Sequence, residues 1–443
     1  MLKTVYPSRL SGQLAAMPSK SMAHRAVVLA ALCAGTTRIA PLQLSQDVRA
    51  TLACARALGL IAEPELAAID GMPGFVSARI TGNPDRRPAR GTRVLDCGES
   101  GSTLRFFIPL ALDGGGSVRF IGHGKLMQRP LAVYEELFRP LGVSWSREGD
   151  ALTVEGALTP GTYALPGDVS SQFITGLLLA LPALPGDSRI VLTTPLESRP
   201  YVELTRRAQA SFGVVSSWEE GGRALLIPGG QRAVSPGDAR VEGDWSHAAF
   251  ALVAGALGSA PVRLTGLDMD SLQGDRAICA ILRAMGADIR REGEALVSYP
   301  SKLHASCVDV SQVPDLVPAL AVAMASARGE SRITGAARLR VKESDRLAAM
   351  RAALCAAGAD VTELPDGLII HGGGCDPSEG CDPCGMPLHA AAIDGCNDHR
   401  VVMAMAVASA LSDGPLTISD AEAVAKSAPA FWEEFESLGG KTR

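Results

Sequence analysis

The segment Arg340-Val341-Lys342-Glu343-Ser344-Asp345-Arg346 places charged groups of both signs directly before a predicted apolar helix, residues 347–357. If these residues form one helix, Lys342 and Arg346 are four positions apart, share a face and could hold one anion between them. Glu343 lies beside the first cation and is a candidate proton carrier. The alternative is a solvated helix start with ion pairs between neighbouring turns. The rest of the chain decides between the two interpretations.

Helix starts of this polar kind recur six times, each followed by a run rich in Ala, Leu and Val. Neighbouring starts are about 70 to 85 residues apart, which indicates an internal repeat. The six openings are SKSMAHR from Ser19, GESGSTLR from Gly98, DVSSQF from Asp168, GDWSHAAF from Gly243, VPDLVPAL from Val313 and CNDHR from Cys396.

A second helix follows each first one and is predicted to end at a glycine, because glycine readily takes the left-handed conformation common at helix C-termini. Short β-branched or alternating segments predict strands at 117–122, 189–194, 261–266, 331–335 and 415–420. The chain is therefore predicted to be an α/β (α+β) protein of six modules, and two domains of three modules each are the natural packing. The six glycines are Gly59, Gly142, Gly213, Gly286, Gly358 and Gly439.

The composition argues against several classes of protein. Of the 443 residues 47% are hydrophobic and 20% are charged, so the chain can bury a large core. The formal net charge is −5 and no basic tract stands out, which argues against nucleic acid as a partner. No run of about 18 apolar residues occurs, and the N-terminus lacks the apolar core of a signal peptide. We therefore expect a cytoplasmic protein without a membrane segment.

Basic residues gather at the helix openings and just after them, in spite of the negative net charge. Helix N-termini offer unpaired N–H groups and partial positive charge, so they are natural anion sites. Ordinary capping explains Ser and Asp at these places but not Lys and Arg. If the openings of both domains face one interdomain cleft, that cleft would attract a small polyanion. The cations are Lys20, Arg25, Arg105, Lys125, Arg129, Lys342, Arg346, Arg400 and Lys426.

Together these motifs resemble the enolpyruvyl transferase family, in particular its members that act on shikimate 3-phosphate. The resemblance covers the whole chain, through PSKSMAHR (18–25), GESGSTLR (98–105), GKLMQRP (124–130), DVSSQF (168–173), ESRPY (197–201), VEGDWS (241–246), LQGD (272–275), PD (314–315), RVKESDR (340–346), NDHR (397–400) and AKS (425–427). It implies two similar domains, each of three βαβαββ-type units around buried helices, an inside-out α/β barrel. It also implies one domain of residues 1–18 and 240–443, an inserted domain of residues 19–239, and an active site in the cleft between them.

The resemblance implies a reaction as well. The enolpyruvyl group of phosphoenolpyruvate would pass to the 5-hydroxyl of shikimate 3-phosphate, and inorganic phosphate would leave after a tetrahedral intermediate. Glu343 matches the residue expected to handle the methylene proton, and Asp315 the one expected to take the hydroxyl proton. Lys20 would help at the leaving group or in proton transfer. Such chemistry needs an acid, a base and fixed cations, but no metal or other cofactor. A monomer is expected.

By the same resemblance, two sets of residues would hold the substrates. Phosphoenolpyruvate would be bound by Lys20, Gly101, Lys125, Gln172, Arg346, Arg400 and Lys426. Shikimate 3-phosphate would be bound by Lys20, Ser21, Arg25, Ser170, Ser171, Gln172, Ser198, Tyr201, Asp315 and Lys342.

The chain departs from the family pattern at a few positions. The loop before Lys20 is one residue shorter than the common Pro-Gly-Ser-Lys-Ser, and Glu99 stands where many members have Asn. Arg338 and Lys125 replace, respectively, an Asn and an Arg, and the second change loses a bidentate fork. Gly101 is the position where a methyl group would crowd the phosphoenolpyruvate site, so the resemblance predicts sensitivity to glyphosate.

Two alternatives remain open at the level of sequence. The sister enzyme that uses UDP-N-acetylglucosamine has a loop cysteine as proton donor, but residues 122–130 here contain none. A non-catalytic, metal-stabilised repeat scaffold would bind zinc through a Cys/His-rich segment, although that segment lacks a second closely spaced pair. The zinc candidates are His371, Cys375, Cys381, Cys384, His389, Cys396 and His399.

Overall fold

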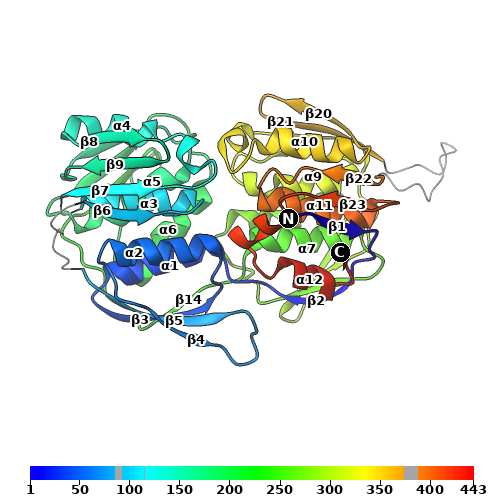
Figure 1. The fold of residues 1–443 in the computed structure, drawn as a ribbon, viewed down its shortest axis with the longest axis horizontal. Coiled ribbons are helices and arrows are strands. Elements are labelled where there is room, and N and C mark those ends of the chain that lie inside the picture. Colours follow the sequence, from blue (N-terminus) through cyan, green and yellow to red (C-terminus); the bar gives the residue numbers. More distant parts are fainter. Residues whose placement is uncertain (85–91, 114, 374–387) are drawn as a thin grey trace. The chain divides into compact units, whose positions relative to one another are not determined.

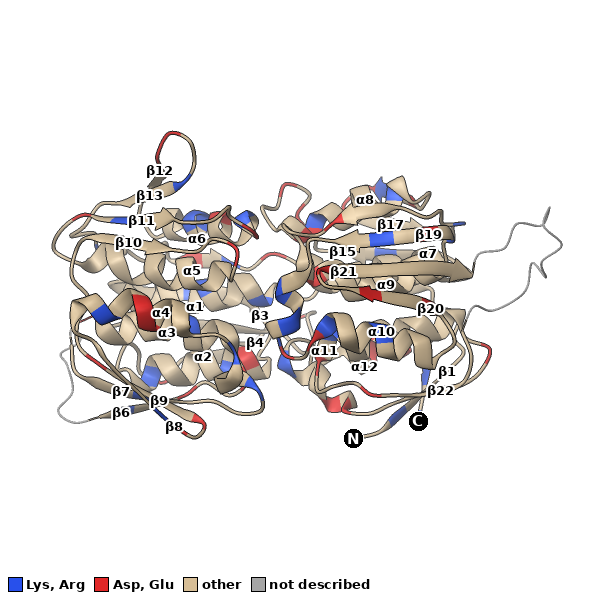
Figure 2. Ribbon diagram, turned by 90° about the horizontal axis from the view of Figure 1, so that it is seen from above, with Lys and Arg blue, Asp and Glu red and all other residues tan. Residues whose placement is uncertain are grey.

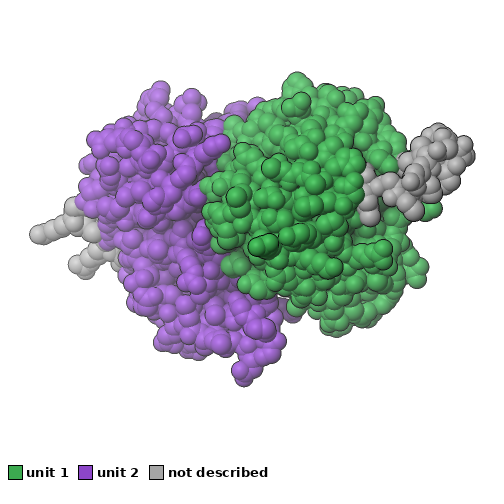
Figure 3. All heavy atoms as spheres, turned by 45° about the vertical axis from the view of Figure 1, so that its right-hand side comes forward, with its two compact units in different colours: residues 1–17, 243–443 green, residues 18–242 purple. Residues whose placement is uncertain are grey.

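The computed structural model describes residues 1–84, 92–113, 115–373 and 388–443. The chain divides into two compact units, coloured separately in Figure 3. Unit 1 comprises residues 1–17 and 243–443, and unit 2 comprises residues 18–242. The chain therefore passes from one unit to the other twice (Figure 1).

One strand order recurs in the six four-stranded sheets of the described chain. In the sheet β6-β7-β9-β8, β6 and β7 are parallel, whereas β9 is antiparallel to both β7 and β8. A helix follows each strand of the parallel pair, so that the chain order is β6, α3, β7, α4, β8, β9. The predicted βαβαββ module is thus confirmed, and three modules make up each unit.

Unit 2 contains the following elements. The first module has α1 (Lys20–Leu32), β3 (Gly35–Leu42), α2 (Gln46–Ala57), β4 (Glu65–Ala68), β5 (Val76–Gly82) and β14 (Asp238–Arg240). The second has β6 (Arg93–Asp96), α3 (Gly101–Leu112), β7 (Ser117–Ile121), α4 (Ala132–Phe138), β8 (Ser144–Glu148) and β9 (Ala151–Glu155). The third has β10 (Thr162–Leu165), α5 (Ser171–Ala180), β11 (Ser188–Leu192), α6 (Arg199–Ser211), β12 (Ser217–Trp218) and β13 (Ala224–Ile227).

Unit 1 repeats the pattern. Its first module has β2 (Gly12–Ala15), α7 (Trp245–Leu257), β15 (Val262–Thr265), α8 (Ile278–Ala284), β16 (Asp288–Glu292) and β17 (Ala295–Tyr299). The second has β18 (Cys307–Asp309), α9 (Val317–Ala325), β19 (Arg328–Thr334), α10 (Arg346–Ala356), β20 (Asp360–Leu364) and β21 (Gly367–Gly373). The third has β22 (Ala391–Ile393), α11 (His399–Ala408), β23 (Leu416–Ile418), α12 (Phe431–Ser437), β24 (Lys441–Thr442) and β1 (Lys3–Tyr6).

Three modules are completed by strands from distant parts of the chain. Strand β14 pairs with β3, β2 pairs with β15, and β1 pairs with both β23 and β24. The two crossing segments also bond to each other: Asp244 N donates to the Met17 carbonyl and Ser19 N to the Glu242 carbonyl, both at 2.8 Å. In unit 2 the last strand, β14, thus completes the sheet of the first module. In unit 1 the two N-terminal strands, β1 and β2, complete sheets whose other strands come from residues 243–443.

The first helix of each module forms the core. Helices α5, α7 and α9 carry no Lys, Arg, Asp or Glu (Figure 2), and α7, α9 and α11 contact one another. The second helices end as predicted at glycines in the left-handed conformation, for example Gly213 at φ +73° and Gly358 at φ +97°. Over the described part of the chain, none of the helices has the length and hydropathy needed to cross a bilayer.

Candidate active site

In unit 1, the guanidinium of Arg346 is the centre of a buried charge cluster. Arg346 is the first residue of α10 and is 1% exposed. Its Nε donates to Asp398 at 2.7 Å, Nη1 to Asp315 at 3.0 Å and Nη2 to Glu343 at 2.7 Å. Burial alone would lower the pKa of Arg346, but the three carboxylates raise it above its ordinary value. The guanidinium therefore stays charged.

Two further cations approach Asp315, which lies on the short 3₁₀ helix η5 (Pro314–Leu316) before α9. Nη2 of Arg400 is 3.3 Å from its Oδ2, and Nζ of Lys342 is 4.0 Å from its Oδ1. Burial would raise the pKa of Asp315, but Arg400, Lys342 and Arg346 together hold it well below its usual range. Asp315 is therefore ionised at any physiological pH.

Asp398 fixes the start of α11. It is fully buried and caps the helix by accepting from the backbone N–H of Arg400 at 3.0 Å. Its Oδ2 also accepts from the Ser344 hydroxyl at 2.9 Å. Next to it, the Asn397 carbonyl accepts from Nζ of Lys426, at the end of the 3₁₀ helix η9 (Ala421–Lys426), at 2.6 Å. One cap residue thus joins the N-termini of α10 and α11 and lies beside a fourth cation.

In unit 2, Arg25 has a different kind of surroundings. Its guanidinium is buried in α1 and donates to the carbonyls of Ser21 and Tyr201 at 2.6 and 2.9 Å. It also donates to the hydroxyls of Thr205 and Thr175 at 2.8 and 3.4 Å. All four acceptors are neutral, and burial lowers the pKa of Arg25 to about 10. The Arg25 guanidinium, held by residues of α1, α5 and α6, is therefore a buried cation whose charged form a bound anion would stabilise.

The starts of α3 and α5 meet through Gln172. Its Oε1 accepts from Nη1 of Arg105 at 2.8 Å, and its Nε2 donates to the Ser102 hydroxyl at 2.9 Å. Gly101, the first residue of α3, lies against this pair: a Cβ atom there would lie 2.8 Å from Nη1 of both Arg105 and Arg129. The absent side chain therefore keeps room beside two guanidinium groups.

The remaining predicted residues of unit 2 lie at helix openings. Lys20 begins α1 and its Nζ is 2.9 Å from Oδ2 of Asp47. Ser170 and Ser198 are the N-cap residues of α5 and α6, and Ser171 is the first residue of α5. Lys125 is exposed on the loop after β7.

The comparisons with known proteins agree with this architecture. The family model described as EPSP synthase (3-phosphoshikimate 1-carboxyvinyltransferase) matches residues 5–435. A relative named 3-phosphoshikimate 1-carboxyvinyltransferase from Clostridium novyi is 42% identical, over 98% of this chain and 97% of its own length. One of the same name from Clostridium kluyveri is 43% identical, over 99% of this chain and 97% of its own length. The chain belongs to the EPSP synthase family.

Solved structures show the same fold. EPSP synthase from Acinetobacter baumannii matches with a TM-score of 0.75 and 26% identity, over 100% of this chain and 99% of its own. The enolpyruvyl transferase NikO from Streptomyces tendae matches with a TM-score of 0.76 at 18% identity, over 100% of this chain and 98% of its own, which shows the fold alone. The predicted fold class of this EPSP synthase family member is therefore confirmed.

One local prediction was wrong. Lys342 and Arg346 do not share a helix face, because α10 begins only at Arg346 and Lys342 follows the 3₁₀ helix η6 (Ala337–Val341). Asp345 is the reason: its Oδ1 accepts from the Ala348 N–H at 3.1 Å, so the helix starts after it. The two cations nevertheless both approach Oδ1 of Asp315.

The departures from the family pattern also have structural partners. The Glu99 carboxylate fills the space beside Gly124, where a Cβ atom would lie 2.5 Å from its Oε2. Arg338 donates to the Ser311 carbonyl and adds positive charge near Lys342. Glu99 thus lies against the loop after β7 that carries Lys125, and Arg338 belongs to η6, which directly precedes Lys342.

Sequence reasoning assigned no role to several residues that the structure places in these clusters. Asp398, in the quoted motif NDHR, is the clearest case, and its position before an apolar helix is the signal of a cap. Arg105 and Arg129 were counted only as cations at helix openings, and Asp47 lies on α2, outside the openings. No pattern in the sequence could assign these partners, because they come from other helices.

The alternative of a zinc site stays untested. Cys375, Cys381 and Cys384 lie outside the described residues. Within the described part of the chain, no three His, Cys, Asp or Glu side chains are grouped so that they could hold a metal ion.

Behind Arg400 lies a second buried carboxylate, Asp275. It accepts from the hydroxyl of Ser246, which itself accepts from Nη2 of Arg400 at 3.2 Å. Burial and the nearby charge of Asp315 raise the pKa of Asp275 to about 6. The folded state therefore binds its proton more tightly than the unfolded chain does, whose Asp titrates near pH 4.

We predict that Asp275→Asn makes the protein more stable at neutral pH. In the wild type, stability should fall as the pH rises from about 4 to 6, because folding then opposes ionisation of Asp275. The variant should escape this loss, which amounts to at most about 3 kcal/mol. Urea unfolding at pH 4, 6 and 8 measures the difference, with the half-buried Asp288→Asn as control. A variant that is less stable than wild type by the same amount at each pH would contradict the prediction.

Proposed function

We propose that this protein is a transferase that moves the enolpyruvyl group of phosphoenolpyruvate to the 5-hydroxyl of shikimate 3-phosphate and releases inorganic phosphate, a step of aromatic amino-acid biosynthesis. The observation that carries the proposal is the match along the whole chain to relatives that bear the name of this activity. The charge clusters at the helix openings of both units agree with two anionic substrates.

We assign shikimate 3-phosphate mainly to unit 2. The buried Arg25 has only neutral acceptors among its recorded partners, so a phosphate group would supply the missing negative charge. Hydroxyl and amide groups at the starts of α1, α5 and α6 would hold the remaining oxygens. These are Ser21, Ser170, Ser171, Gln172, Ser198 and Tyr201, with Lys20 beside them and Asp315 and Lys342 from unit 1.

We assign phosphoenolpyruvate to the cations of both units. Arg346, Arg400 and Lys426 of unit 1 and Lys20, Lys125, Gln172 and Gly101 of unit 2 make up the set. In unit 1 the Nη atoms of Arg346 contact Asp315 and Glu343, so an arriving carboxylate or phosphate would replace these partners. The exchange would free both acids for chemistry at the moment when the substrate binds. Because the set draws on both units, we propose that both take part in one reaction.

We propose that Asp315 and Glu343 each carry out one of the two proton transfers. An acid whose pKa is held far below its usual range cannot donate a proton at neutral pH, but it can accept one. We therefore propose Asp315 as the base that takes the 5-hydroxyl proton. Glu343 remains to protonate the methylene carbon, which makes the neighbouring carbon electrophilic. The hydroxyl oxygen then adds to that carbon. The tetrahedral intermediate loses phosphate with help from Lys20, and a proton returns from the new methyl group to the Glu343 carboxylate, which restores the C=C bond of the enolpyruvyl group.

The proposed reaction balances without redox change, and fixed cations can neutralise the developing charges. We therefore propose that it needs no metal or other cofactor. We also propose that the protein is a monomer. Phosphorylated substrates do not cross a bilayer unaided, which favours the cytoplasm as its location.

The purified protein should release inorganic phosphate from phosphoenolpyruvate when shikimate 3-phosphate is present and a chelator is added. UDP-N-acetylglucosamine in place of the shikimate ester should give no release, because residues 122–130 offer no cysteine as proton donor. A colorimetric phosphate assay measures both reactions. Release only with the UDP sugar would support the sister activity, and release with neither would support a binding scaffold.

Glu343→Gln should lower kcat by about 100-fold or more, because the amide cannot supply the methylene proton. KM for shikimate 3-phosphate should change little. Glu363→Gln is a matched control: Glu363 also binds an arginine, Arg340, at 2.7 Å, but it has no proposed catalytic role. Steady-state kinetics of the two variants measure the difference. Full turnover by Glu343→Gln would refute the assignment of the proton donor.

Glyphosate should inhibit the wild type in competition with phosphoenolpyruvate. Gly101→Ala should weaken this inhibition by about tenfold or more, because the new methyl group would lie 2.8 Å from the guanidinium nitrogens of Arg105 and Arg129. KM for phosphoenolpyruvate should rise in parallel, whereas KM for shikimate 3-phosphate should not. Inhibition kinetics that are identical in both proteins would show that Gly101 does not border this site.

A further inference from the structure

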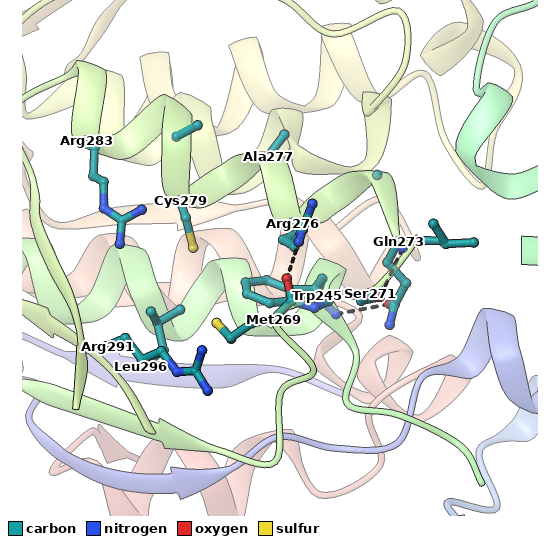
Figure 4. A pocket seen from close by; sticks show the side chains of 13 residues that line it. Trp245, Met269, Ser271, Gln273, Arg276, Ala277, Cys279, Arg283, Arg291 and Leu296 are labelled. Carbon is teal, nitrogen blue, oxygen red and sulfur yellow. Dashed lines mark hydrogen bonds between the residues drawn. The ribbon is translucent and has the colours of Figure 1, made fainter. Parts of the chain in front are cut away.

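Unit 1 contains a cavity of about 640 Å³ among α7, α8, β16, β17 and the 3₁₀ helix η4 (Gly274–Ala277). Its apolar wall includes Trp245, Met269 and Leu296, and the thiol of Cys279 lies beside them. Figure 4 shows the side chains of Arg283 and Arg291 reaching the cavity from opposite sides, from α8 and from β16. None of these residues was assigned to either substrate. The volume is within the range that holds a small organic molecule.

The arginines of this cavity are held in place without being neutralised. Arg283 donates to the Ile289 carbonyl through Nε and Nη2, at 3.0 and 2.8 Å. Arg291 donates to the Gly293 carbonyl at 3.2 Å, and Arg276 donates to the Met269 carbonyl. Across the described residues, no carboxylate forms an ion pair with any of the three. Main-chain carbonyls orient these guanidinium groups but leave their charge unbalanced.

Two neighbouring arginines, unlike those that line the cavity, do have acidic partners. Arg290, one residue before Arg291 on β16, binds the carboxylate of Asp288 at 2.5 Å and lies over the ring of Tyr299. Arg263 binds Glu292 at 2.9 Å. Side chains on one face of the sheet thus have acidic partners, whereas those directed to the cavity do not.

No negative charge lies inside the cavity. Burial raises the pKa of the Cys279 thiol to about 11, so it stays neutral. Asp275, which belongs to η4, is not among the lining residues and instead accepts from Ser246. An anion that enters would therefore be attracted by the guanidinium groups at the mouth and would contact the apolar wall, and no carboxylate among the lining residues would repel it.

We propose that this cavity binds a small organic anion that consists of a flat apolar body and one carboxylate. The guanidinium groups of Arg283 and Arg291 suit the planar carboxylate, because their paired donors match its two oxygens. The apolar wall, which includes the indole of Trp245, suits the planar body. Neither an inorganic anion nor a neutral apolar molecule would use both halves of the site.

Binding in the cavity would change the surroundings of Arg400. Arg276 and Ala277 of η4 line the cavity, and Asp275 of the same turn holds Ser246, which accepts from Arg400. A shift of η4 would therefore change the position or charge balance of Arg400. This consequence rests on the proposed function, because Arg400 is there a ligand of phosphoenolpyruvate. The binding itself does not.

Isothermal titration of the full-length protein without substrates tests the binding. Naphthalene-2-carboxylate is the probe. Two control ligands each lack one of its features: naphthalene-2-methanol has the ring system without the charge, and acetate has the carboxylate without the ring system. The probe should bind with a Kd of about 1 mM or tighter, and both control ligands at least about fivefold more weakly. Raising the salt concentration should weaken binding of the probe, since its charge pairs are exposed at the cavity mouth.

Arg283→Gln and Arg291→Gln should each raise the Kd of the probe about five- to tenfold. Arg290→Gln, the matched control, should leave it unchanged, because Arg290 pairs with Asp288. The proposal is overturned if the probe fails to bind at millimolar concentration, if the neutral alcohol binds equally well, or if all three variants behave alike. Because no substrate is present, these outcomes do not depend on the proposed function.

Discussion

The ion cluster around Arg346 is the constraint on which the arrangement of unit 1 depends. Burial of the Arg346 guanidinium is offset by three carboxylates, which come from separate elements: η5, the loop before α10, and the cap of α11. Removing Arg346 would leave these carboxylates, including the fully buried Asp398, without their shared cation. The cluster therefore fixes the N-termini of α9, α10 and α11 relative to one another, in a core that is otherwise made of aliphatic helices.

Unit 2 also contains a buried guanidinium, that of Arg25, but without carboxylates among its recorded acceptors. Arg25 is buried to a similar degree, but its recorded acceptors are carbonyls and hydroxyls. These acceptors orient the guanidinium without cancelling its charge, and burial lowers its pKa to about 10. Repeats of one module have thus produced two kinds of helix opening. One is suited to holding a phosphate group, and the other, rich in carboxylates, is suited to moving protons.

The repeating elements could be predicted from sequence because each depends on local features. Polar openings, apolar runs and terminal glycines such as Gly213 and Gly358 act within one helix, so all six modules were found. The partners of those modules could not be predicted in the same way. Strand β14 joins β3 across about 200 residues, and Arg25 meets Thr205 from 180 residues away. The helix predicted over 347–357 agrees with α10 to within one residue, but its cap was not assigned, because in the sequence Asp345 is one of several charges in the segment 340–346.

The geometry of Arg346 also suggests an order of events in the proposed reaction. Its contacts with Asp398 are the most enclosed, since Asp398 is fully buried and also caps α11. Its contacts with Asp315 and Glu343 involve side chains that are about 15% exposed, so an incoming anion can displace them. Asp398 would then keep the guanidinium in place while Asp315 and Glu343 are released. The proton donor and the base would become available only after the substrate has replaced them, which limits unproductive proton transfer in its absence.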